Sequence, residues 1–411
     1  MPPEERPERA STTFIAQRLD GVSASPTLAM TKLSFELKAR GRSIITLSQG
    51  EPDFHTEPHV REAGIRAIRD NRTKYTAVDG MPEFKQAIAE KFCRDNGLHF
   101  DPDQIIVSSA SKTILFNAAL AILNPGDEVI IPAPHWVSYP DIVRVAEGLP
   151  VYVPCRQNNG FRMRPEDLES AITPRTRMLI LCSPCNPTGA VYSVEDLKVL
   201  GEVLARHPQV FVMVDEIYEH LVYDGLKSPS VAACAPALAG RILTVNGMSK
   251  GYAMTGWRLG FAGGPKKVIE AISTLQSQNT SSPNEISQIA AIAALNGPQE
   301  FIERNKTLFQ ERRDLAVSML NAVPGLHCGR PEGAFYIFCD CTGIIGKRTA
   351  QGRLIETDGD FVLALLEQEG VAAVHGEAFG MSPFFRISYA LSIDTMREAI
   401  TRIERFCASS S

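Results

Sequence analysis

One lysine stands among small residues in a way that could make it chemically reactive. Lys250 lies in the segment GMSKGYAMTGWRLG, residues 247–260, shortly after the apolar run 242–245. Small residues let the backbone approach a bound group closely. A desolvated lysine near another cation, here Arg258, has a lowered pKa, and its neutral amine can form a Schiff base with a carbonyl compound. A lysine taken alone is usually a solvated surface residue, so this interpretation depends on the surrounding segment.

Asp215 ends the most apolar strand predicted in the chain, residues 210–214. A carboxylate at such a point needs a partner, because burial without one is costly. One suitable partner is a protonated pyridine nitrogen, which the carboxylate would keep charged so that the ring can accept electrons. The alternative is an Asp that caps a helix starting at Glu216. Tyr218 and Asn186 could both donate hydrogen bonds to a phenolate oxygen.

A phosphate group could bind at the segment SSASK, residues 108–112, between a predicted strand and a predicted helix. Backbone amides at a helix N-terminus bind phosphate readily. The nucleotide-binding patterns Gly-x4-Gly-Lys-Ser/Thr and Gly-x-Gly-x-x-Gly are absent here, so one small phosphate fits better than a nucleotide. The alternative is an ordinary serine-rich helix cap.

These residues follow short apolar runs that alternate with longer amphipathic stretches, the pattern of an α/β fold. The predicted strands cover residues 105–107, 128–131, 177–181, 210–214 and 242–245. Helices are expected over 113–123 and from a cap at Ser193 to about residue 206, with Asp196 completing a variant of the capping box. Strands joined by helices indicate a mostly parallel sheet buried on both faces. Ligands bind beyond the carboxyl ends of such strands.

The flanking segments predict a second, smaller domain built from both ends of the chain. Length suggests two to three domains for 411 residues, at about 150 residues each. Charged helices are expected over 298–321 and 358–369, and strands over 334–338 and 385–389. We predict an N-terminal arm at residues 1–12, a small domain from 13–54 and 300–411, and a large domain at 55–299.

The overall composition argues against several classes of protein. Lys and Arg number 42 against 47 Asp and Glu, a net charge of −5, which disfavours a nucleic-acid partner. No apolar run approaches the ~18 residues of a membrane-spanning helix. The polar, proline-containing start of the sequence does not resemble a signal peptide. We therefore expect a soluble cytoplasmic protein without a membrane partner.

The cysteines number 9, an odd count that excludes a full disulfide framework and indicates a reducing compartment. Cys182 and Cys185 have the spacing of a redox pair or of half a zinc site, but no second pair has zinc spacing, so neither role is favoured. His55 and His59 are four residues apart, and Pro58 would break a helix that aligned them. We expect no metal site.

Together these features resemble the pyridoxal-phosphate-dependent aminotransferases of fold type I, class I/II. The segment 247–260 fits the lysine attachment pattern of that family, and further motifs follow in the family's order over roughly 340 residues. They are SQGEPDF (48–54), TKYT (73–76), PHWVSYP (134–140), SPCNPTG (183–189), DEIY (215–218), EGAFY (332–336) and FRISYA (385–390). The sequences of these motifs are most similar to those of bacterial aspartate aminotransferases of the subgroup typified by thermophile enzymes.

The resemblance implies a large domain with a mostly parallel seven-stranded sheet between helices, and a smaller α+β domain. It implies pyridoxal 5′-phosphate as cofactor, held covalently by Lys250, which would also move the proton of the substrate α-carbon. Asp215 would pair with the pyridine nitrogen, and Asn186 and Tyr218 with the 3-oxygen. The remaining cofactor contacts that it implies are Trp136 on the ring face, and Arg258, the amides of Ala110 and Ser111, and Tyr75 of a second subunit on the phosphate.

For the substrate, the resemblance implies that Arg386 binds the α-carboxylate in a bidentate fork. Gly50, Asn186 and Trp136 would help to hold the substrate. Lys112 matches the lysine that takes the side-chain carboxylate in the thermophile-type subgroup. The stretch 273–283, where animal and enterobacterial enzymes carry an arginine for that task, has no cation here.

Three departures from the family's pattern bear on how the phosphate is bound and on whether prephenate is a substrate. The phosphate turn reads Ala110-Ser111, where relatives often have two glycines, and Gly247 stands where many relatives have a serine. One phosphate contact would therefore be missing or replaced. Some members accept prephenate with the help of a lysine near the N-terminus, and Ser23 at that position argues mildly against this substrate.

The leading hypothesis is a homodimeric aspartate aminotransferase that converts L-aspartate and 2-oxoglutarate to oxaloacetate and L-glutamate in two half-reactions. A dimer is expected because Tyr75 would serve the neighbouring subunit's site. The alternative keeps the cofactor but changes the substrate or the reaction: an aromatic or broad-range aminotransferase, or a biosynthetic enzyme on the same scaffold such as a lyase or oxidase. A non-enzymatic sensor fused to a DNA-binding domain is disfavoured by the net charge and by the short segment before Gly50.

Overall fold

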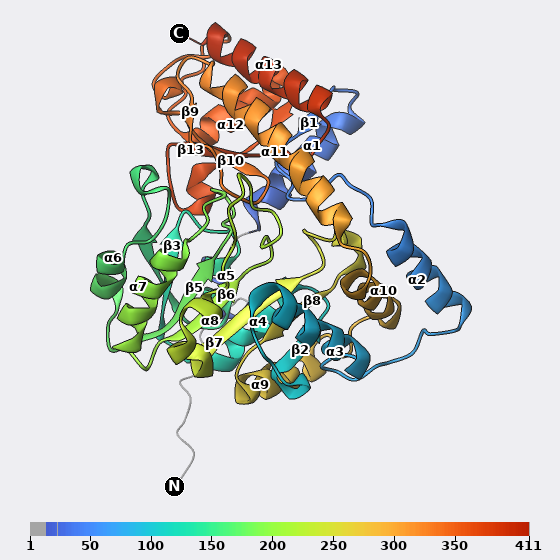
Figure 1. Ribbon diagram of the computed structural model, residues 1–411. Coiled ribbons are helices and arrows are strands. Elements are labelled where there is room, and N and C mark those ends of the chain that lie inside the picture. Colours follow the sequence, from blue (N-terminus) through green and yellow to red (C-terminus); the bar gives the residue numbers. More distant parts are fainter. Residues whose placement is uncertain (1–13, 23, 411) are drawn as a thin grey trace.

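The large sheet of the protein has seven strands in the order β2-β8-β7-β6-β5-β3-β4. The computed structural model describes residues 14–22 and 24–410, and Figure 1 shows the sheet and its helices in the lower part of the view. The strands are β2 (Ile105–Ser108), β3 (Glu128–Ala133), β4 (Leu149–Pro154), β5 (Thr176–Cys182), β6 (Phe211–Asp215), β7 (Ile242–Gly247) and β8 (Gly260–Gly263).

Only β8 runs against the other strands of this sheet. The pairs β3–β4, β3–β5, β5–β6 and β6–β7 are parallel, and β8 is antiparallel to both of its neighbours, β7 and β2. Strand β2 therefore points the same way as β7. All five strands expected from the sequence thus end at the same edge of the sheet, and the predicted α/β fold with a mostly parallel seven-stranded sheet is confirmed.

Helices cover both faces of this sheet because successive strand residues point to opposite sides. On one face, Ile105, Leu179 and Val212 pack with side chains of α3 (Pro82–Lys91), α7 (Val194–Ala205) and α10 (Glu285–Asn296). On the other face, Ile106 and Met213 pack with side chains of α4 (Ser111–Ile122), α5 (Tyr139–Val145) and α9 (Lys266–Gln278). Three other helices of this part are α2 (Pro58–Arg69), α6 (Pro165–Ala171) and α8 (Val231–Cys234).

The two ends of the chain meet in a second group of elements, at the top of Figure 1. A four-stranded antiparallel sheet has the order β12 (Val374–His375), β13 (Phe384–Ser388), β10 (Tyr336–Asp340) and β9 (His327–Cys328). Strand β1 (Ile45–Thr46), from the N-terminal part, pairs in parallel with β11 (Val371–Ala372). The helices here are α1 (Pro26–Ala39), α11 (Glu300–Asn321), α12 (Asp358–Glu369) and α13 (Ile393–Ser409). The domain boundaries at residues 54/55 and 299/300 stay a prediction, and the predicted arm at 1–12 lies outside the described residues.

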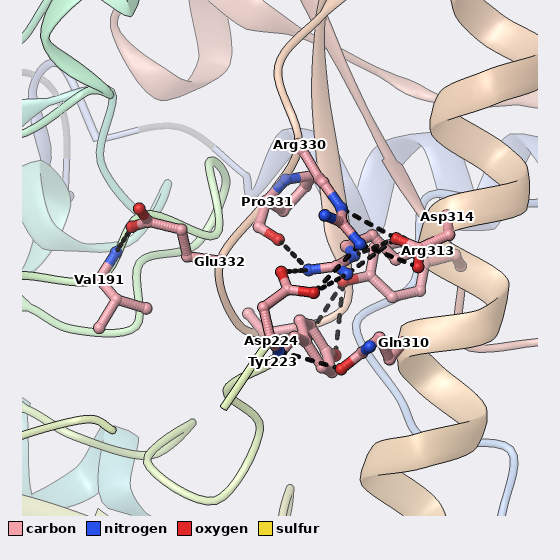
Figure 2. Close-up of polar contacts among 11 residues, drawn as sticks. Val191, Tyr223, Asp224, Gln310, Arg313, Asp314, Arg330, Pro331 and Glu332 are labelled. Carbon is pink, nitrogen blue, oxygen red and sulfur yellow. Dashed lines mark hydrogen bonds and ion pairs between the residues drawn. The ribbon is translucent and has the colours of Figure 1, made fainter. Parts of the chain in front are cut away.

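A buried arginine joins this second group to the loop that follows β6 (Figure 2). Arg313 of α11 has a side chain with no solvent exposure. Its two terminal nitrogens donate to the two carboxylate oxygens of Asp224 at 2.7 and 2.9 Å, and one of them also donates to the carbonyl of Pro331 at 2.9 Å. The guanidinium lies 4.8 Å from the ring centre of Tyr223. This cluster fixes α11 against the segment before β10 and the segment after Tyr218.

The structure corrects some element boundaries. Strand β10 begins at Tyr336 rather than at residue 334, because Ala334 has a φ of 56° and lies in a turn. The five predicted strands do not include β4 and β8, because the prolines of β4 and the glycines of β8 are residues that strands usually lack. The capping box of Ser193 and Asp196 is confirmed at the start of α7. Within the described residues, no helix is long and apolar enough to cross a membrane.

Candidate active site

A cavity of about 490 Å³ lies where the carboxyl ends of the parallel strands face the second group of elements. Eleven of the twelve site residues predicted from the sequence line it, and Tyr75 is the exception. They are Gly50, Ala110, Ser111, Lys112, Trp136, Asn186, Asp215, Tyr218, Lys250, Arg258 and Arg386. The parallel strands bring them together: the segments after β2, β3, β5, β6 and β7 all open at this edge, as expected for a ligand site in such a sheet.

Lys250 is the amine of the cavity. Its Nζ donates a hydrogen bond to the carbonyl of Gly50, 200 positions earlier in the chain. Burial, together with the cations of Arg386 and Arg258, lowers the pKa of Lys250 to about 8, although Glu51 and Asp215 oppose this shift. A lysine with such a pKa has an appreciable fraction of neutral amine near pH 7–8, so it can act as a nucleophile and as a base.

Asp215 is buried at the end of β6, with 6% of its surface exposed. Its Oδ2 accepts a hydrogen bond from the hydroxyl of Tyr139 at 2.8 Å, and its Oδ1 accepts one from the amide of Ile217 at 3.3 Å. Burial raises the pKa of Asp215, while these hydrogen bonds and the charge of Lys250 oppose the rise. A protonated ring nitrogen placed in the cavity would give this carboxylate the charged partner that burial demands.

The anion-binding end of the cavity is the start of α4. Ala110 is the N-cap residue with extended backbone (φ 168°), so no glycine is needed there. The first amides of a helix have no partner inside the helix and attract anions. Arg258 and Lys112 line the same cavity, and Arg258 has a φ of 55°. Arg258 and a helix N-terminus together are a donor set suited to a phosphate dianion.

Ser111 fills the space that a side chain at position 247 would need. Its hydroxyl donates to the carbonyl of Asn246 at 2.7 Å. A Cβ built on Gly247 would stand 2.5 Å from Ser111 Oγ, and a Cβ on Gly260 would stand 2.1 Å from the amide nitrogen of Ser111. The departures seen in the sequence, a serine in the phosphate turn and a glycine at 247, are therefore complementary.

Arg386 lies at the opposite side of the site, in the middle of β13, and is 2% exposed. One terminal nitrogen donates to Asn186 Oδ1 at 2.9 Å and the other to the carbonyl of Ser48 at 2.5 Å. Its Nε is buried without a hydrogen-bond partner. An unsatisfied N–H of a buried guanidinium is costly, so an incoming carboxylate has a donor waiting for it.

The sequence analysis missed two tyrosines of the cavity. Tyr139 supports Asp215, as described above. Tyr336 donates to or accepts from the hydroxyl of Tyr218 at 2.8 Å, and the guanidinium of Arg386 lies 4.5 Å from its ring centre. A Cβ on Gly50 would stand 2.0 Å from the Tyr336 hydroxyl, so the glycine makes room for this tyrosine. Both tyrosines belong to motifs that the resemblance recognised, but no residue-level signal gave them a role.

Lys112 and Trp136 contact each other inside the cavity. The Nζ of Lys112 lies 4.7 Å from the centre of the Trp136 ring. Burial lowers the pKa of Lys112, and the nearby charge of Arg258 lowers it further. The aromatic face holds this cation without neutralising its charge, so Lys112 remains available to an anion.

Two predicted features remain apart from this site. Tyr75 is 92% exposed and does not line the cavity of its own chain. Cys182 does line it, and a hydrogen bond with Cys185 and burial raise the pKa of the Cys182 thiol. Cys182 also donates to the carbonyl of Pro184 at 3.3 Å. Ser23, which bore on prephenate, lies outside the described residues.

The residues of this cavity fit pyridoxal 5′-phosphate. A buried carboxylate suits the ring nitrogen, Tyr218 and Asn186 can donate to a ring oxygen, and the start of α4 with Arg258 suits a phosphate. Lys250 supplies the amine that such an aldehyde requires. The fold and the site together therefore define a pyridoxal-phosphate-dependent enzyme of fold type I.

Comparison with known proteins agrees with this class. Residues 42–403 match the family "Aminotransferase class I and II". An "Aspartate/prephenate aminotransferase" of Cereibacter sphaeroides is 54% identical, covering 97% of this chain and all of that protein. The crystal structure of the aspartate aminotransferase from Rhizobium meliloti superposes with a TM-score of 0.94 at 52% identity, covering 97% and 99% of the two chains. The Thermus thermophilus aspartate aminotransferase with maleate gives a TM-score of 0.89 at 42% identity, covering 95% and 99%.

The chain belongs to the class I and II aminotransferases. It is accordingly an enzyme that transfers amino groups with pyridoxal 5′-phosphate as cofactor.

Proposed function

We propose that this aminotransferase converts L-aspartate and 2-oxoglutarate to oxaloacetate and L-glutamate. The observation that supports this most directly is the presence of two cations, Arg386 and Lys112, in the same cavity as Lys250. Aspartate and glutamate each carry two carboxylates, and each carboxylate would meet one cation. The name of the Cereibacter relative and the dicarboxylate maleate in the Thermus structure agree with this substrate class.

In the proposed reaction, Arg386 binds the α-carboxylate through its guanidinium, with Asn186 and the carbonyl of Ser48 holding that side chain in place. Lys112 takes the side-chain carboxylate. These two contacts orient the substrate so that its α-hydrogen faces Lys250. The neutral amine of Lys250 then removes the α-proton as a general base and later returns a proton.

The residues around the ring would hold the cofactor as the sequence predicts. When bound, pyridoxal 5′-phosphate supplies the aldehyde that accepts the amino group and the ring that withdraws electrons from the α-carbon. Asp215 would keep the ring nitrogen protonated, Tyr218 and Asn186 would donate to the ring oxygen, and Trp136 would cover one face. Ala110, Ser111 and Arg258 would hold the phosphate, and Gly50 would leave space beside the substrate.

We also propose a homodimer in which Tyr75 reaches the phosphate of the neighbouring site, and a cytoplasmic location. Tyr75 is 92% exposed, and Ile65 and Ile68 of α2 are also exposed apolar residues. An apolar surface of this kind is suited to contact with a second chain. A mixed dimer formed from a Tyr75→Phe chain and a Lys250→Ala chain would test whether the sites are shared.

The names of several relatives, the Cereibacter protein among them, favour a second substrate, prephenate. The serine at position 23 argues mildly against it. A panel of amino donors with 2-oxoglutarate, and of glutamate with oxaloacetate and prephenate, scored by kcat/KM, separates these substrates from an aromatic or broad specificity. Lys250→Ala is the baseline of the panel, and turnover retained by this variant would contradict the mechanism.

A further inference from the structure

A buried ion pair lies next to the two residues that carry the proposed chemistry, outside the cavity itself. Lys91, the last residue of α3, has a side chain with no solvent exposure, and its Nζ pairs with Glu219 Oε1. The side chain of Glu219 is 6% exposed. Nothing in the proposed reaction uses this pair, although Glu219 directly follows Tyr218.

Asn96 completes the contacts of both charges. Its Oδ1 accepts from Lys91 Nζ at 2.7 Å, and its Nδ2 donates to Glu219 Oε2 at 2.6 Å. Asn96 ends a π-helical turn, Phe92–Asn96, that follows α3 directly. Such turns are rare and occur often at functional sites. Here the turn brings residue 96 back to residue 91, so one carboxylate is held by two side chains of the same segment.

The carboxylate of Glu219 is ionised in the folded protein. Burial raises its pKa, but the charge of Lys91 and the hydrogen bonds from Lys91 and Asn96 help to outweigh burial, and the pKa is lowered to about 2. The other titratable groups near this pair are Asp95, whose Oδ2 lies 4.0 Å from Lys91 Nζ, Arg94, and Glu216, whose pKa burial raises to about 7. The geometry is therefore that of a buried ion pair.

His220 carries the network to the lysine segment. Its Nε2 lies 3.3 Å from Glu219 Oε1, and its ring meets the Tyr252 ring edge to face at 5.5 Å between centres. A Cβ built on Gly251 would stand 2.7 Å from Cδ2 of His220. The histidine ring thus packs directly on the residue after Lys250. Segments 218–220 and 250–252 are held against each other.

Stability alone is a weak reason for such a pair. Removing two charges from water costs about as much as their attraction returns, and apolar residues of similar volume often serve stability as well or better. What the pair adds is a fixed geometry, because an ionised carboxylate that accepts directed hydrogen bonds from Lys91 and Asn96 tolerates little movement.

We propose that Lys91, Asn96, Glu219 and His220 are positioning residues that fix the Tyr218 hydroxyl and the Lys250 amine relative to each other. This inference rests on the roles proposed above for Lys250 and Tyr218. None of the four side chains lines the cavity, so they act through the residues that follow or precede them. A displacement of a reacting group by about 1 Å can slow an enzyme on the order of 100-fold.

The first variant is Glu219→Gln, which keeps the shape and removes the charge. We expect kcat for aspartate to fall about 10-fold while KM changes less than about 2-fold, because substrate contacts are untouched. The pH midpoint of the visible absorbance of the holoenzyme should move, since it reports the environment of Lys250. Glu51, Asp215, Arg258 and Arg386 also face Lys250, and none of them is altered.

The double variant Lys91→Met/Glu219→Gln separates positioning from stability. Glu219→Gln alone leaves the buried Lys91 without its partner charge, which should lower the Tm of the cofactor-free protein. Removing both charges should bring this Tm back to that of the wild type, because no buried charge is left unpaired. The lowered kcat and the shifted absorbance midpoint should persist. This variant also keeps the proposal testable if Glu219→Gln alone fails to fold.

Glu128→Gln is the matched control. Glu128 is 5% exposed and accepts hydrogen bonds from Arg175 at 2.6 Å and Thr173 at 2.5 Å. It stands at the start of β3, at the edge of the sheet opposite the cavity. Its loss should lower the Tm without changing kcat or the absorbance midpoint.

Two results would overturn the proposal: wild-type kcat and midpoint in Glu219→Gln, or recovery of both together with the Tm in the double variant. Either result would assign the network to stability alone. Lys250→Ala, measured in parallel, keeps this inference separate from the proposed function. If Lys250→Ala is inactive, a normal Glu219→Gln contradicts only the inference, whereas turnover by Lys250→Ala contradicts the proposed function.

Discussion

The hydroxyl of Ser111 stands 2.5 Å from the point that a Cβ on Gly247 would occupy. The two positions share one space, which only one side chain can fill. Because Ser111 also lies at the first turn of α4, its hydroxyl is beside the amides proposed to bind the phosphate. The serine at 111 thus disfavours a side chain at 247, where the carbonyl of Leu259 and the Cα of Gly260 would also lie 3.0 and 3.1 Å from a Cβ.

This relationship predicts that a side chain can be moved from one position to the other. Gly247→Ser alone should collide with Ser111 and weaken pyridoxal-phosphate binding at least about 10-fold, a loss of about 1.4 kcal/mol. Ser111→Gly/Gly247→Ser should recover part of that affinity, because the contacts with the backbone of Leu259 and Gly260 remain. The measurement is the dissociation constant of the cofactor, from titration of the cofactor-free protein. Equal losses in the single and double variants would show that the positions are not coupled.

Lys112 should affect kcat/KM mainly for substrates that carry an acidic side chain. In Lys112→Ala, kcat/KM for aspartate and glutamate should fall about 100-fold, because a partly buried cation that meets a carboxylate is worth about 2–3 kcal/mol. An aromatic donor such as phenylalanine should lose less than about 3-fold. Lys112→Arg is the control that keeps the charge. Similar losses for acidic and aromatic donors would contradict the role in dicarboxylate recognition.

Tyr336 should connect the α-carboxylate side of the site to Tyr218. Gly50→Ala should raise KM for aspartate strongly, since the new methyl would lie 2.0 Å from the Tyr336 hydroxyl. Tyr336→Phe removes that oxygen and should lower kcat several-fold by depriving Tyr218 of its hydrogen bond. Combining the two changes should recover part of the KM loss. Steady-state kinetics on the three variants test this, and a normal KM in Gly50→Ala would refute it.

Much of the site followed from the sequence because it depends on local order. Asp215 ends a strand and Asn186 and Lys250 each follow one, and the carboxyl ends of parallel strands meet at one edge. Arg386 is different: it lies in the middle of β13, and its partner Asn186 is 200 positions away. Only the packing of two sheets brings these residues together, so spacing along the chain could not predict the contact and the family resemblance was needed.

Physical reasons also explain why some elements and contacts could not be predicted from the sequence. Strand β8 reads Gly-Phe-Ala-Gly, which lacks both β-branched residues and alternation, yet it is fully buried between β2 and β7. Gly260 is small because Ser111 lies against it. Tyr139 begins α5, one helical turn after Trp136, and its contact with Asp215 crosses from one strand end to another. Such contacts are set by the tertiary fold and leave no periodic signal.

The lowered pKa of Lys250 predicts a specific pH dependence of stability in the cofactor-free protein. Burial lowers this pKa from 10.5 to about 8. Between those values the unfolded lysine holds a proton that the folded lysine has lost, so the free energy of unfolding should rise with pH there. The slope is at most about 1.4 kcal/mol per pH unit. Below pH 8 both forms are protonated, and the destabilisation is complete.

The comparison with Lys250→Met isolates this contribution from all other titrating groups. Urea unfolding of both cofactor-free proteins at pH 7 to 10 should show Lys250→Met more stable at pH 7, with the difference shrinking as pH rises. A difference that stays constant over this range would mean that the folded Lys250 is not desolvated as its burial indicates.

Arg313 should contribute to stability and to the relative placement of the parts it joins, without touching the substrate. Arg313→Met removes a fully buried guanidinium from Asp224 and Pro331 (Figure 2). Asp224 keeps only Arg330, whose nitrogen lies 3.0 Å away and whose side chain is 55% exposed. Breaking one side of a buried pair costs about 3–5 kcal/mol, and the partial exposure of Asp224 puts the expected loss at the lower end.

Arg313→Lys is the informative companion variant, because lysine keeps the charge but cannot form the two-pronged contact. If the loss in urea unfolding is nearly as large in Arg313→Lys as in Arg313→Met, directed hydrogen bonds hold this junction. If lysine restores full stability, charge alone does so, and the bidentate geometry has no energetic consequence. In both variants KM for aspartate should stay within about 2-fold of wild type at temperatures well below unfolding, since Arg313 and Asp224 lie outside the cavity.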